Sequence, residues 1–139
     1  MADFANETAA PRTLLKGVAD QVVGLSEVDS TNLYAKQMAK NGCAHGSMIW
    51  ADYQTAGRGR FDRRWENEKG KNVMVSIVLR PDMQPEEAPK LTLLAAVAVA
   101  GAIEKCTGIK VGIKWPNDIM VMGKKCCGIL VEAGVRNAK

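Results

Sequence analysis

Runs of apolar side chains predict six strands and two helices along this chain. The clearest strand spans residues 72–79, where apolar side chains at 73, 75, 77 and 79 alternate with Met74, Ser76 and Val78. A period of two places each row on one face of a sheet. Shorter β-branched runs predict the other strands, at residues 22–28, 47–53, 111–113, 119–121 and 126–131.

The two predicted helices are bounded by residues that cap helix ends. The first follows an N-cap at Asp29 or Ser30 and closes at Asn41–Gly42. The second occupies residues 88–106, begins after a proline and two acids, and ends at Gly108. It is apolar nearly all round, so we expect it to lie inside, against a sheet. This order of elements predicts a mixed α+β fold with an antiparallel component.

The length and composition favour one compact, soluble domain. A chain of 139 residues is long enough for one core and too short for two ordinary domains. Residues 1–17 mix small and polar side chains, so we expect a disordered or loosely docked N-terminus before a folded part at 18–139. The start lacks the features of a secretory signal. The longest apolar stretch, residues 91–103, is shorter than the roughly 20 residues that span a bilayer. We therefore expect a cytoplasmic protein without a membrane partner.

The cysteines and the net charge narrow the chemistry further. Cys43, Cys106, Cys126 and Cys127 form no C-x-x-C pair, so we expect free thiols in a reducing cytosol rather than a zinc site. The last two share one predicted strand and should point to opposite faces and pack rather than react. His45 has no partner motif and is expected at the surface. A net charge of +4 suggests anionic ligands without requiring a nucleic acid.

The positive charge is concentrated in a loop at residues 54–65, whose arginines and single aspartate give a local charge of +3. Gly57 and Gly59 allow backbone angles closed to other residues and let N–H groups approach a ligand. Planar guanidinium groups for carboxylate or phosphate are offered by Arg58, Arg60 and Arg63. The loop has neither a P-loop G-x-x-x-x-G-K-[ST] nor a complete dinucleotide-binding G-x-G-x-x-G. A solvated basic loop, and a nucleic-acid surface with Phe61 and Trp65 stacked on bases, stay open as alternatives.

A second polar group lies in the Lys-Trp-Pro-Asn-Asp segment at residues 114–118, where the proline stiffens the chain. Asp118 is a candidate magnesium ligand and Lys114 a candidate phosphate partner, with a plain structural turn as the alternative. Lys125 stands at the opening of the last predicted strand, and an exposed lysine without a role is its alternative. Gly128 within that strand indicates that a ligand or another backbone lies close.

Four segments together resemble the biotin–protein ligase family in content, order and spacing. They are Asp29-Ser30-Thr31-Asn32, residues 54–65 with their Gly-Arg-Gly-Arg centre, the segment at 114–118, and residues 125–132. The resemblance runs from Val22 to Glu132. It implies a catalytic fold related to class II aminoacyl-tRNA synthetases, with a mixed, largely antiparallel sheet and packed helices. This chain would carry the N-terminal part of that domain.

The same resemblance implies an ATP-dependent ligase that forms biotinyl-5′-AMP and transfers biotin to a lysine of a biotin carboxyl carrier protein or domain. Attack of one anion on another requires cations to offset the repulsion, and the implied catalytic residues are Arg58, Arg60 and Lys125. The implied biotin-binding residues are Ser30, Thr31, Asn32, Gln54, Arg58, Gly59, Arg60, Lys125 and Gly128. The implied nucleotide-binding residues are Arg63, Trp65, Lys114, Asn117 and Asp118, with Mg²⁺ at Asp118.

Two departures from the family pattern modify these expectations. The family usually has glycine where this chain has Asp62, and an acid beside phosphate-binding arginines is expected either to weaken nucleotide binding or to alter how the loop becomes ordered. The family also continues beyond position 139 through further strands and a small C-terminal β-domain. A truncated biotin-binding fragment without turnover and a lipoate–protein ligase of the same superfamily are therefore the alternatives. Strands left unpaired by truncation would favour a homodimer. No helix-turn-helix pattern precedes Val22, so we expect neither a repressor nor nucleic-acid binding.

Overall fold

The computed structural model describes residues 19 and 21–134, and these residues form two compact units. The first unit includes the described residues up to Arg58 and residues Asp62–Pro81; the second includes Gly59–Phe61 and the described residues from Asp82 onward. Each unit has its own sheet and its own hydrophobic cluster, whereas the chain length predicts a single core. The predicted loose N-terminus at residues 1–17 lies outside the described residues.

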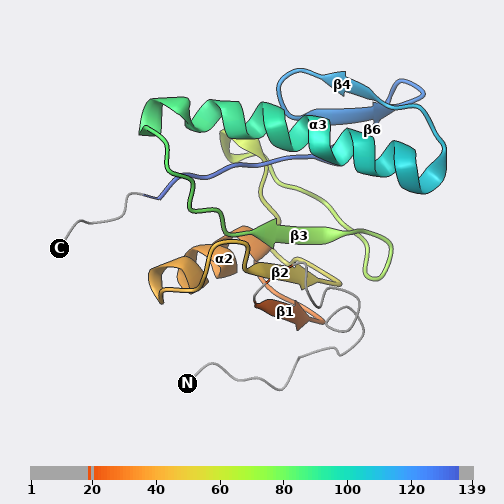
Figure 1. The fold of residues 1–139 in the computed structure, drawn as a ribbon. Coiled ribbons are helices and arrows are strands. Elements are labelled where there is room, and N and C mark those ends of the chain that lie inside the picture. Colours follow the sequence, from red (N-terminus) through yellow and green to blue (C-terminus); the bar gives the residue numbers. More distant parts are fainter. Residues whose placement is uncertain (1–18, 20, 135–139) are drawn as a thin grey trace. The chain divides into compact units, whose positions relative to one another are not determined.

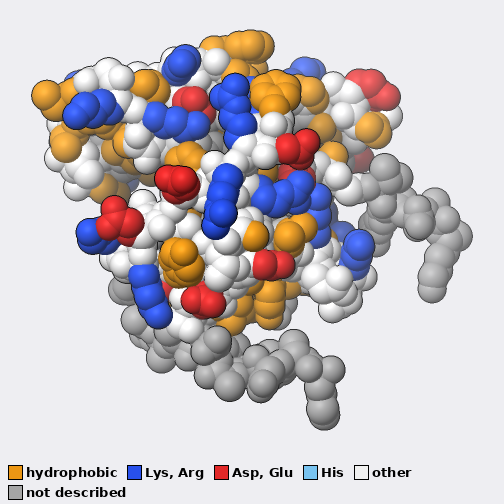
Figure 2. All heavy atoms as spheres, turned by 180° about the vertical axis from the view of Figure 1, so that it is seen from behind, with side chains coloured by type: hydrophobic (Ala, Val, Ile, Leu, Met, Phe, Trp, Pro, Cys, Tyr) orange, Lys and Arg blue, Asp and Glu red, His pale blue; other side chains and the backbone are white. Residues whose placement is uncertain are grey.

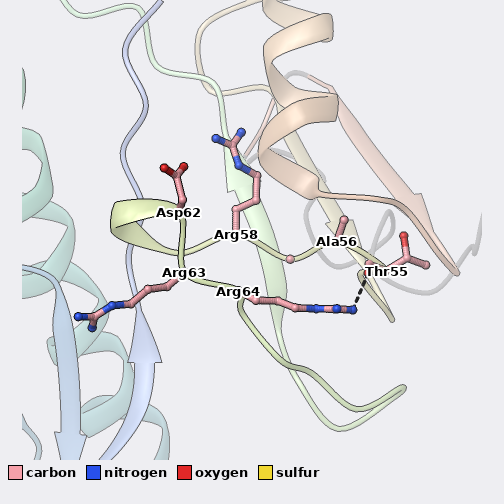
Figure 3. Close-up of a pocket in the computed structure, with 7 residues that line it drawn as sticks. Thr55, Ala56, Arg58, Asp62, Arg63 and Arg64 are labelled. Atoms are coloured by element: carbon pink, nitrogen blue, oxygen red, sulfur yellow. Dashed lines mark hydrogen bonds between the residues drawn. The ribbon is translucent and has the colours of Figure 1, made fainter.

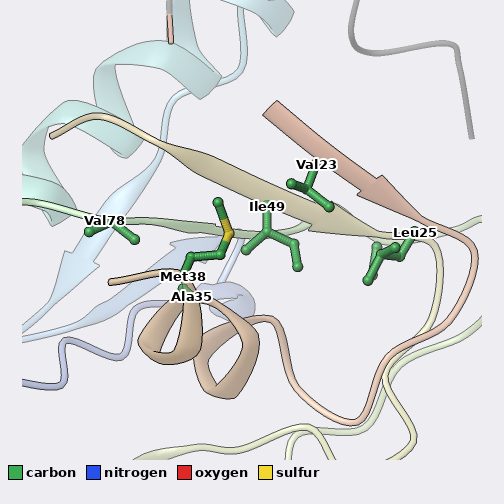
Figure 4. Close-up of a cluster of buried hydrophobic side chains, with 7 residues drawn as sticks. Val23, Leu25, Ala35, Met38, Ile49 and Val78 are labelled. Carbon is green, nitrogen blue, oxygen red and sulfur yellow. The ribbon is translucent and has the colours of Figure 1, made fainter. Parts of the chain in front are cut away.

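In the first unit, one helix packs on a three-stranded sheet (Figure 1). The strand order is β1 (Val22–Leu25), β2 (Met48–Ala51) and β3 (Met74–Ile77), with β1 parallel to β2 and β2 antiparallel to β3. The helix, α2 (Thr31–Lys40), contacts β2 and β3. Figure 4 shows the core between them, which includes Val23, Leu25, Ala35, Met38, Ile49 and Val78. Ile49 is fully buried, so its truncation to alanine would cost about 2–5 kcal/mol.

The alternation predicted for residues 72–79 is present in β3, although the strand is shorter. Met74 and Ser76 are buried, while Val75 and Ile77 are exposed. The inward row therefore carries one serine among apolar residues, and this serine lies beside the start of α2. The predicted helix end is also confirmed, because α2 is followed by Asn41 as C-cap and by Gly42 at φ +84°.

The second unit contains a short 3₁₀ turn, η2 (Pro85–Glu87), a long helix, α3 (Ala88–Thr107), and an antiparallel sheet. The strand order is β4 (Gly112–Lys114), β5 (Asp118–Val121) and β6 (Lys124–Gly128). Gly108 ends α3 in the left-handed conformation, as the sequence predicts. The β5–β6 turn consists of Met122 and Gly123, both at positive φ, which matches the twist of a tight hairpin.

As predicted, α3 packs against a sheet, with contacts to β4 and β5, but the prediction that it lies inside is wrong for the described residues. Ala96 and Ala100 are buried against a cluster that includes Ile119, but the side chains of Leu94 and Val97 are 65% and 62% exposed. The helix packs through one stripe, in which Ala96 and Ala100 are buried and Val99 and Ile103 are partly buried. In a helix that is apolar all round, the sequence does not show which side is buried; the elements that pack against the helix determine it.

Charged side chains of both signs are mixed on the face of the molecule in Figure 2. Lysine and arginine groups lie among aspartate and glutamate groups there, with apolar side chains between them. Among residues 19 and 21–134, no helix combines the length and apolarity that crossing a bilayer requires.

Candidate functional site

A buried polar cluster forms at the start of α2 in the first unit. Ser30 is the N-cap residue, but its side chain makes no capping hydrogen bond. The cap comes instead from Gln54, whose Oε1 accepts hydrogen bonds from the Thr31 main-chain N–H at 2.7 Å and from Thr31 Oγ1 at 3.0 Å. Ser30, Thr31 and Gln54 are all buried. Three of the predicted biotin-binding residues, Ser30, Thr31 and Gln54, therefore lie together here.

Two members of this cluster escaped the sequence analysis. Ser76 Oγ lies 2.9 Å from Thr31 Oγ1 and 2.5 Å from Asn32 Oδ1, and its single hydrogen can be donated to one of them at a time. A serine in the buried row of an alternating strand was the available signal. Asn67 donates to the Gln54 carbonyl and accepts from the Gln54 N–H, both at 2.8 Å. It lies 13 residues from Gln54 without a local pattern to mark it.

The arginine loop surrounds a hollow of about 250 Å³ (Figure 3). Its lining residues are Thr55, Ala56, Gly57, Arg58, Asp62, Arg63 and Arg64. Arg64 is tied down by a 3.1 Å hydrogen bond to the Thr55 carbonyl, while Arg58 and Asp62 extend from the same side of the loop in Figure 3. Arg63 points in the opposite direction from Arg64. The hollow is thus cationic, with one carboxylate at its rim.

The loop does not use its glycines for left-handed backbone angles. Neither Gly57 nor Gly59 has a positive φ; the left-handed residues are Phe61 and Asp62, both at φ 56°, within η1 (Arg60–Asp62). Gly57 is required for space instead, because a Cβ there would lie 2.5 Å from the Trp65 carbonyl oxygen. Trp65 N–H also donates to the Gly57 carbonyl at 2.9 Å. Trp65 therefore closes the base of the loop through its main chain.

In the second unit, Asn117 holds Arg60. Two hydrogen bonds join Asn117 to Ile129. The Ile129 N–H donates to the Asn117 carbonyl oxygen at 2.9 Å, and Asn117 Nδ2 donates to the Ile129 carbonyl oxygen at 3.1 Å. This orients Asn117 Oδ1, which accepts from Arg60 Nη1 at 3.1 Å. The Arg60 guanidinium also lies 4.8 Å from the centre of the Phe61 ring. Arg60 and Arg58, neighbours in the Gly-Arg-Gly-Arg sequence, thus belong to different units.

Asp118 lies between two lysines on the β4–β5–β6 sheet. Lys114 is its cross-strand partner on β4, and Gly128 is its partner on β6. The Lys125 Nζ forms an ion pair with Asp118 Oδ1 at 2.8 Å, without hydrogen-bond geometry. Because cross-strand partners share a face, the structure brings the predicted residues Lys114, Asp118 and Lys125 together.

The cysteines are free thiols, as predicted. The β5–β6 register shifts at a bulge between Ile119 and Met120, which pair with Cys127 and Lys125. Cys126 is therefore the extra residue and is exposed, so the prediction that it packs is wrong. Cys127 packs against the second-unit cluster, and burial, followed by the neighbouring Cys126, raises the pKa of its thiol.

The described residues contain no group of three or more histidine, cysteine, aspartate or glutamate side chains able to hold a metal. Asp118 offers a single carboxylate, already paired with Lys125. Such a site does not fit a protein-held metal. It fits a Mg²⁺ ion that arrives with nucleotide phosphates, because magnesium commonly binds through one or two carboxylates plus phosphate and water.

Comparison with known proteins finds relatives that are ligases. The model of the biotin/lipoate A/B protein ligase family matches residues 24–138. The bifunctional ligase/repressor BirA of Bacillus subtilis is 50% identical over 105 residues, which cover 76% of this chain and 32% of that protein. The biotin–[acetyl-CoA-carboxylase] ligase of Paracoccus denitrificans is 38% identical over 111 residues, which cover 78% of this chain and 45% of that protein.

Solved structures show the same likeness. The biotin protein ligase of Aquifex aeolicus in complex with biotin and ATP matches with a TM-score of 0.70 and 33% identity, over 82% of this chain and 47% of that one. The Leishmania major enzyme in complex with biotinyl-5-AMP matches with a TM-score of 0.69 and 28% identity, over 83% and 53%. The chain spans between about a third and about half of the length of these relatives. With a family model that matches nearly all of its described residues, the chain belongs to the biotin/lipoate A/B protein ligase family.

Proposed function

We propose that this chain carries the biotin-binding and adenylate-forming part of an ATP-dependent biotin–protein ligase. The observation that carries the proposal is the pairing, within one unit, of a buried polar cluster at Gln54 with a cationic hollow at Arg58. A ligand with a neutral polar head and an anionic tail matches this pair of environments. Biotin has a ureido head group and a carboxylate, and relatives of this chain have been solved with biotin and with its adenylate.

The orientation of Gln54 favours a ligand acceptor. A main-chain N–H can only donate, so the oxygen of the Gln54 amide must face Thr31. The Nε2 group is then directed away from Thr31. We propose that it donates to the ureido ring, beside the hydroxyl groups of Ser30 and Thr31 and the amide of Asn32.

In the proposed first step, the biotin carboxylate attacks the α-phosphorus of ATP, and the bond to pyrophosphate breaks. Both reactants are anions, so Arg58, Arg60 and Lys125 would offset the repulsion and stabilise the charge on the α-phosphate. Arg63, Trp65, Lys114 and Asn117 would serve the nucleotide side. Mg²⁺ bound with ATP would screen the phosphates, with Asp118 as its protein ligand, directly or through water.

In the proposed second step, the amine of a lysine on a biotin carboxyl carrier protein attacks the carbonyl carbon of the mixed anhydride. AMP leaves, and biotin is joined to the lysine by an amide bond. We assign this reaction to the cytoplasm, where carrier proteins and ATP are found together. The enzyme supplies no nucleophile of its own, which agrees with a site built from cations and amides.

The test is adenylate formation by the purified chain with biotin, ATP labelled at the α-phosphate, and magnesium. Arg58→Ala and Lys125→Ala are each expected to lower the rate by about 100-fold or more, because each removes a group that stabilises transition-state charge. Lys124→Ala is the matched control, since Lys124 is the exposed neighbour of Lys125 on β6. Lipoate replaces biotin in a parallel reaction, because the family model covers lipoate ligases.

The outcomes separate the alternatives. Biotinyl-5′-AMP that depends on Arg58 and Lys125 supports the ligase. Calorimetric biotin binding without adenylate indicates a binding-only fragment, and preferential use of lipoate moves the chain to the lipoate branch. Absence of any biotin binding refutes the proposal.

A further inference from the structure

We infer that Asn67 is a positioning residue for the biotin pocket, acting through the main chain of Gln54. The inference rests on the proposed function, because the ligand of Gln54 is assigned there. Asn67 itself lies outside all four segments that resemble the ligase family.

The contact between Asn67 and Gln54 is a closed pair of hydrogen bonds. Asn67 Nδ2 donates to the Gln54 carbonyl oxygen at 2.8 Å, and the Gln54 N–H donates to Asn67 Oδ1 at 2.8 Å. The side-chain amide thus occupies both polar groups of the Gln54 main chain, in the manner of a neighbouring β-strand. Asn67 is half-buried, so water competes poorly for these bonds. The pair holds the N–H and the carbonyl of Gln54 itself, while its neighbours Tyr53 and Thr55 are hydrogen-bonded to Val28.

The other end of Gln54 is fixed by α2. Its Oε1 accepts from the Thr31 N–H at 2.7 Å, one of the first N–H groups of the helix, which lack a partner within the helix itself. Gln54 is only 7% exposed. With the backbone held by Asn67 and the oxygen held by Thr31, the Nε2 group has one direction available.

Removal of Asn67 would release the N–H and the carbonyl of Gln54, while the hydrogen bonds of Tyr53 and Thr55 to Val28 remain. The Gln54 N–H and carbonyl would turn towards water, and the side-chain amide would shift relative to Thr31. A binding group displaced by about 1 Å can cost up to roughly 100-fold in the step that it serves. The α2 core, which packs through Ala35 and Met38, does not contain Asn67, so the fold should persist.

The first experiment is a calorimetric titration of biotin into the wild-type chain, Asn67→Ala and Asn72→Ala. Asn72 is a matched control because it lies in the same loop, and its Oδ1 accepts the Glu68 N–H at 2.8 Å instead of touching Gln54. Asn67→Ala is expected to weaken biotin binding at least about tenfold, with thermal melting close to that of wild type. Asn72→Ala is expected to bind as wild type does. Equal biotin affinities of Asn67→Ala and wild type overturn the inference.

A second variant gives a readout that a loss of folding cannot imitate. In Asn67→Asp, a protonated carboxyl group offers the same donor and acceptor as the amide, whereas the ionised group has no hydrogen to donate. The biotin affinity of this variant relative to wild type is therefore expected to rise as the pH falls through the pKa of the new carboxyl. The ratio to wild type removes the titration of biotin itself. A ratio that does not change with pH overturns the inference.

Amide hydrogen exchange separates this inference from the proposed function, because it needs no ligand. In Asn67→Ala, the Thr31 and Gln54 amides are expected to exchange faster than in wild type, while amides in the core of α2 do not change. If wild type binds no biotin, the proposed function fails and the Thr31 exchange rate alone decides the positioning role. An unchanged Thr31 rate overturns that role.

Discussion

Replacement of Gly57 by alanine tests how the arginine loop is closed at its base. The added Cβ would lie 2.5 Å from the Trp65 carbonyl oxygen, 3.1 Å from Gln54 Nε2 and 3.3 Å from Trp65 Cβ. Ordinary contact begins at 3.4 Å, so the main chain must open by about 0.9 Å at the first of these contacts. Overpacking of this kind costs about 1–3 kcal/mol. The hydrogen bond from the Trp65 N–H to the Gly57 carbonyl contributes about 0.5–1.5 kcal/mol more where it is lost.

Beyond Gly57 the loop is exposed at Arg58 and at residues 61–64, so we expect it to detach locally while the cores stay folded. A cost of 1–3 kcal/mol shifts the balance between attached and detached loop by roughly 5- to 150-fold. Adenylate formation should fall by up to this factor, according to how much of the loop becomes detached, and the Trp65 amide should lose protection from exchange. Gly112→Ala is the control, because nothing lies within 4 Å of its added Cβ. Wild-type rates together with wild-type Trp65 protection in Gly57→Ala would refute the reasoning.

Three further substitutions or treatments test other parts of the chain. Asp62→Gly is expected to stabilise the loop by about 1 kcal/mol, because an L-residue at φ 56° is strained, and to tighten ATP binding by removing an acid; weaker ATP binding in calorimetry would count against this. Gly101 lies at an exposed position of α3, with open space around an added Cβ. Gly101→Ala should therefore raise the free energy of unfolding, measured by urea titration, by about 0.5–1 kcal/mol. A decrease in this free energy would contradict the prediction. Burial raises the pKa of the Cys127 thiol, so less of this thiol is ionised at mildly alkaline pH. Iodoacetamide should therefore modify Cys106 and Cys126 first. Earlier labelling of Cys127 in peptide mass spectra would contradict this prediction.

The elements could be predicted from the sequence because their signals are local. The strand at residues 72–79 and the end of α3 are each marked by residues that lie close together in the sequence. The depth of α3 could not be predicted in the same way, since a stripe of alanines and a stripe of leucines both look apolar. Packing against Ile119 selects the alanines, and that choice is made by the sheet.

The same distinction between local signals and long-range contacts applies to the candidate site. Its motif residues could be named, but the contacts that orient them join distant positions: Thr31 with Gln54, Ser76 with Thr31, and Arg60 with Asn117. No periodic pattern encodes such pairs. The use made of the loop glycines could not be predicted for a related reason, because glycine permits a positive φ without requiring it. The loop places that angle at Asp62 and its neighbour and uses Gly57 for close approach.

The bulge in β6 has a consequence for the length of this segment. Ile119 pairs with Cys127, and Met120 pairs with Lys125, so Cys126 has no partner on β5. Loss of Cys126 would therefore leave all four β5–β6 pairs unchanged, whereas loss of either neighbour would put Cys126 in that neighbour's place, opposite Met120 or Ile119. A one-residue gap in a related sequence would be tolerated best at this position. What such a gap would remove is the local kink that separates the basic end of the strand, at Lys125, from its apolar end.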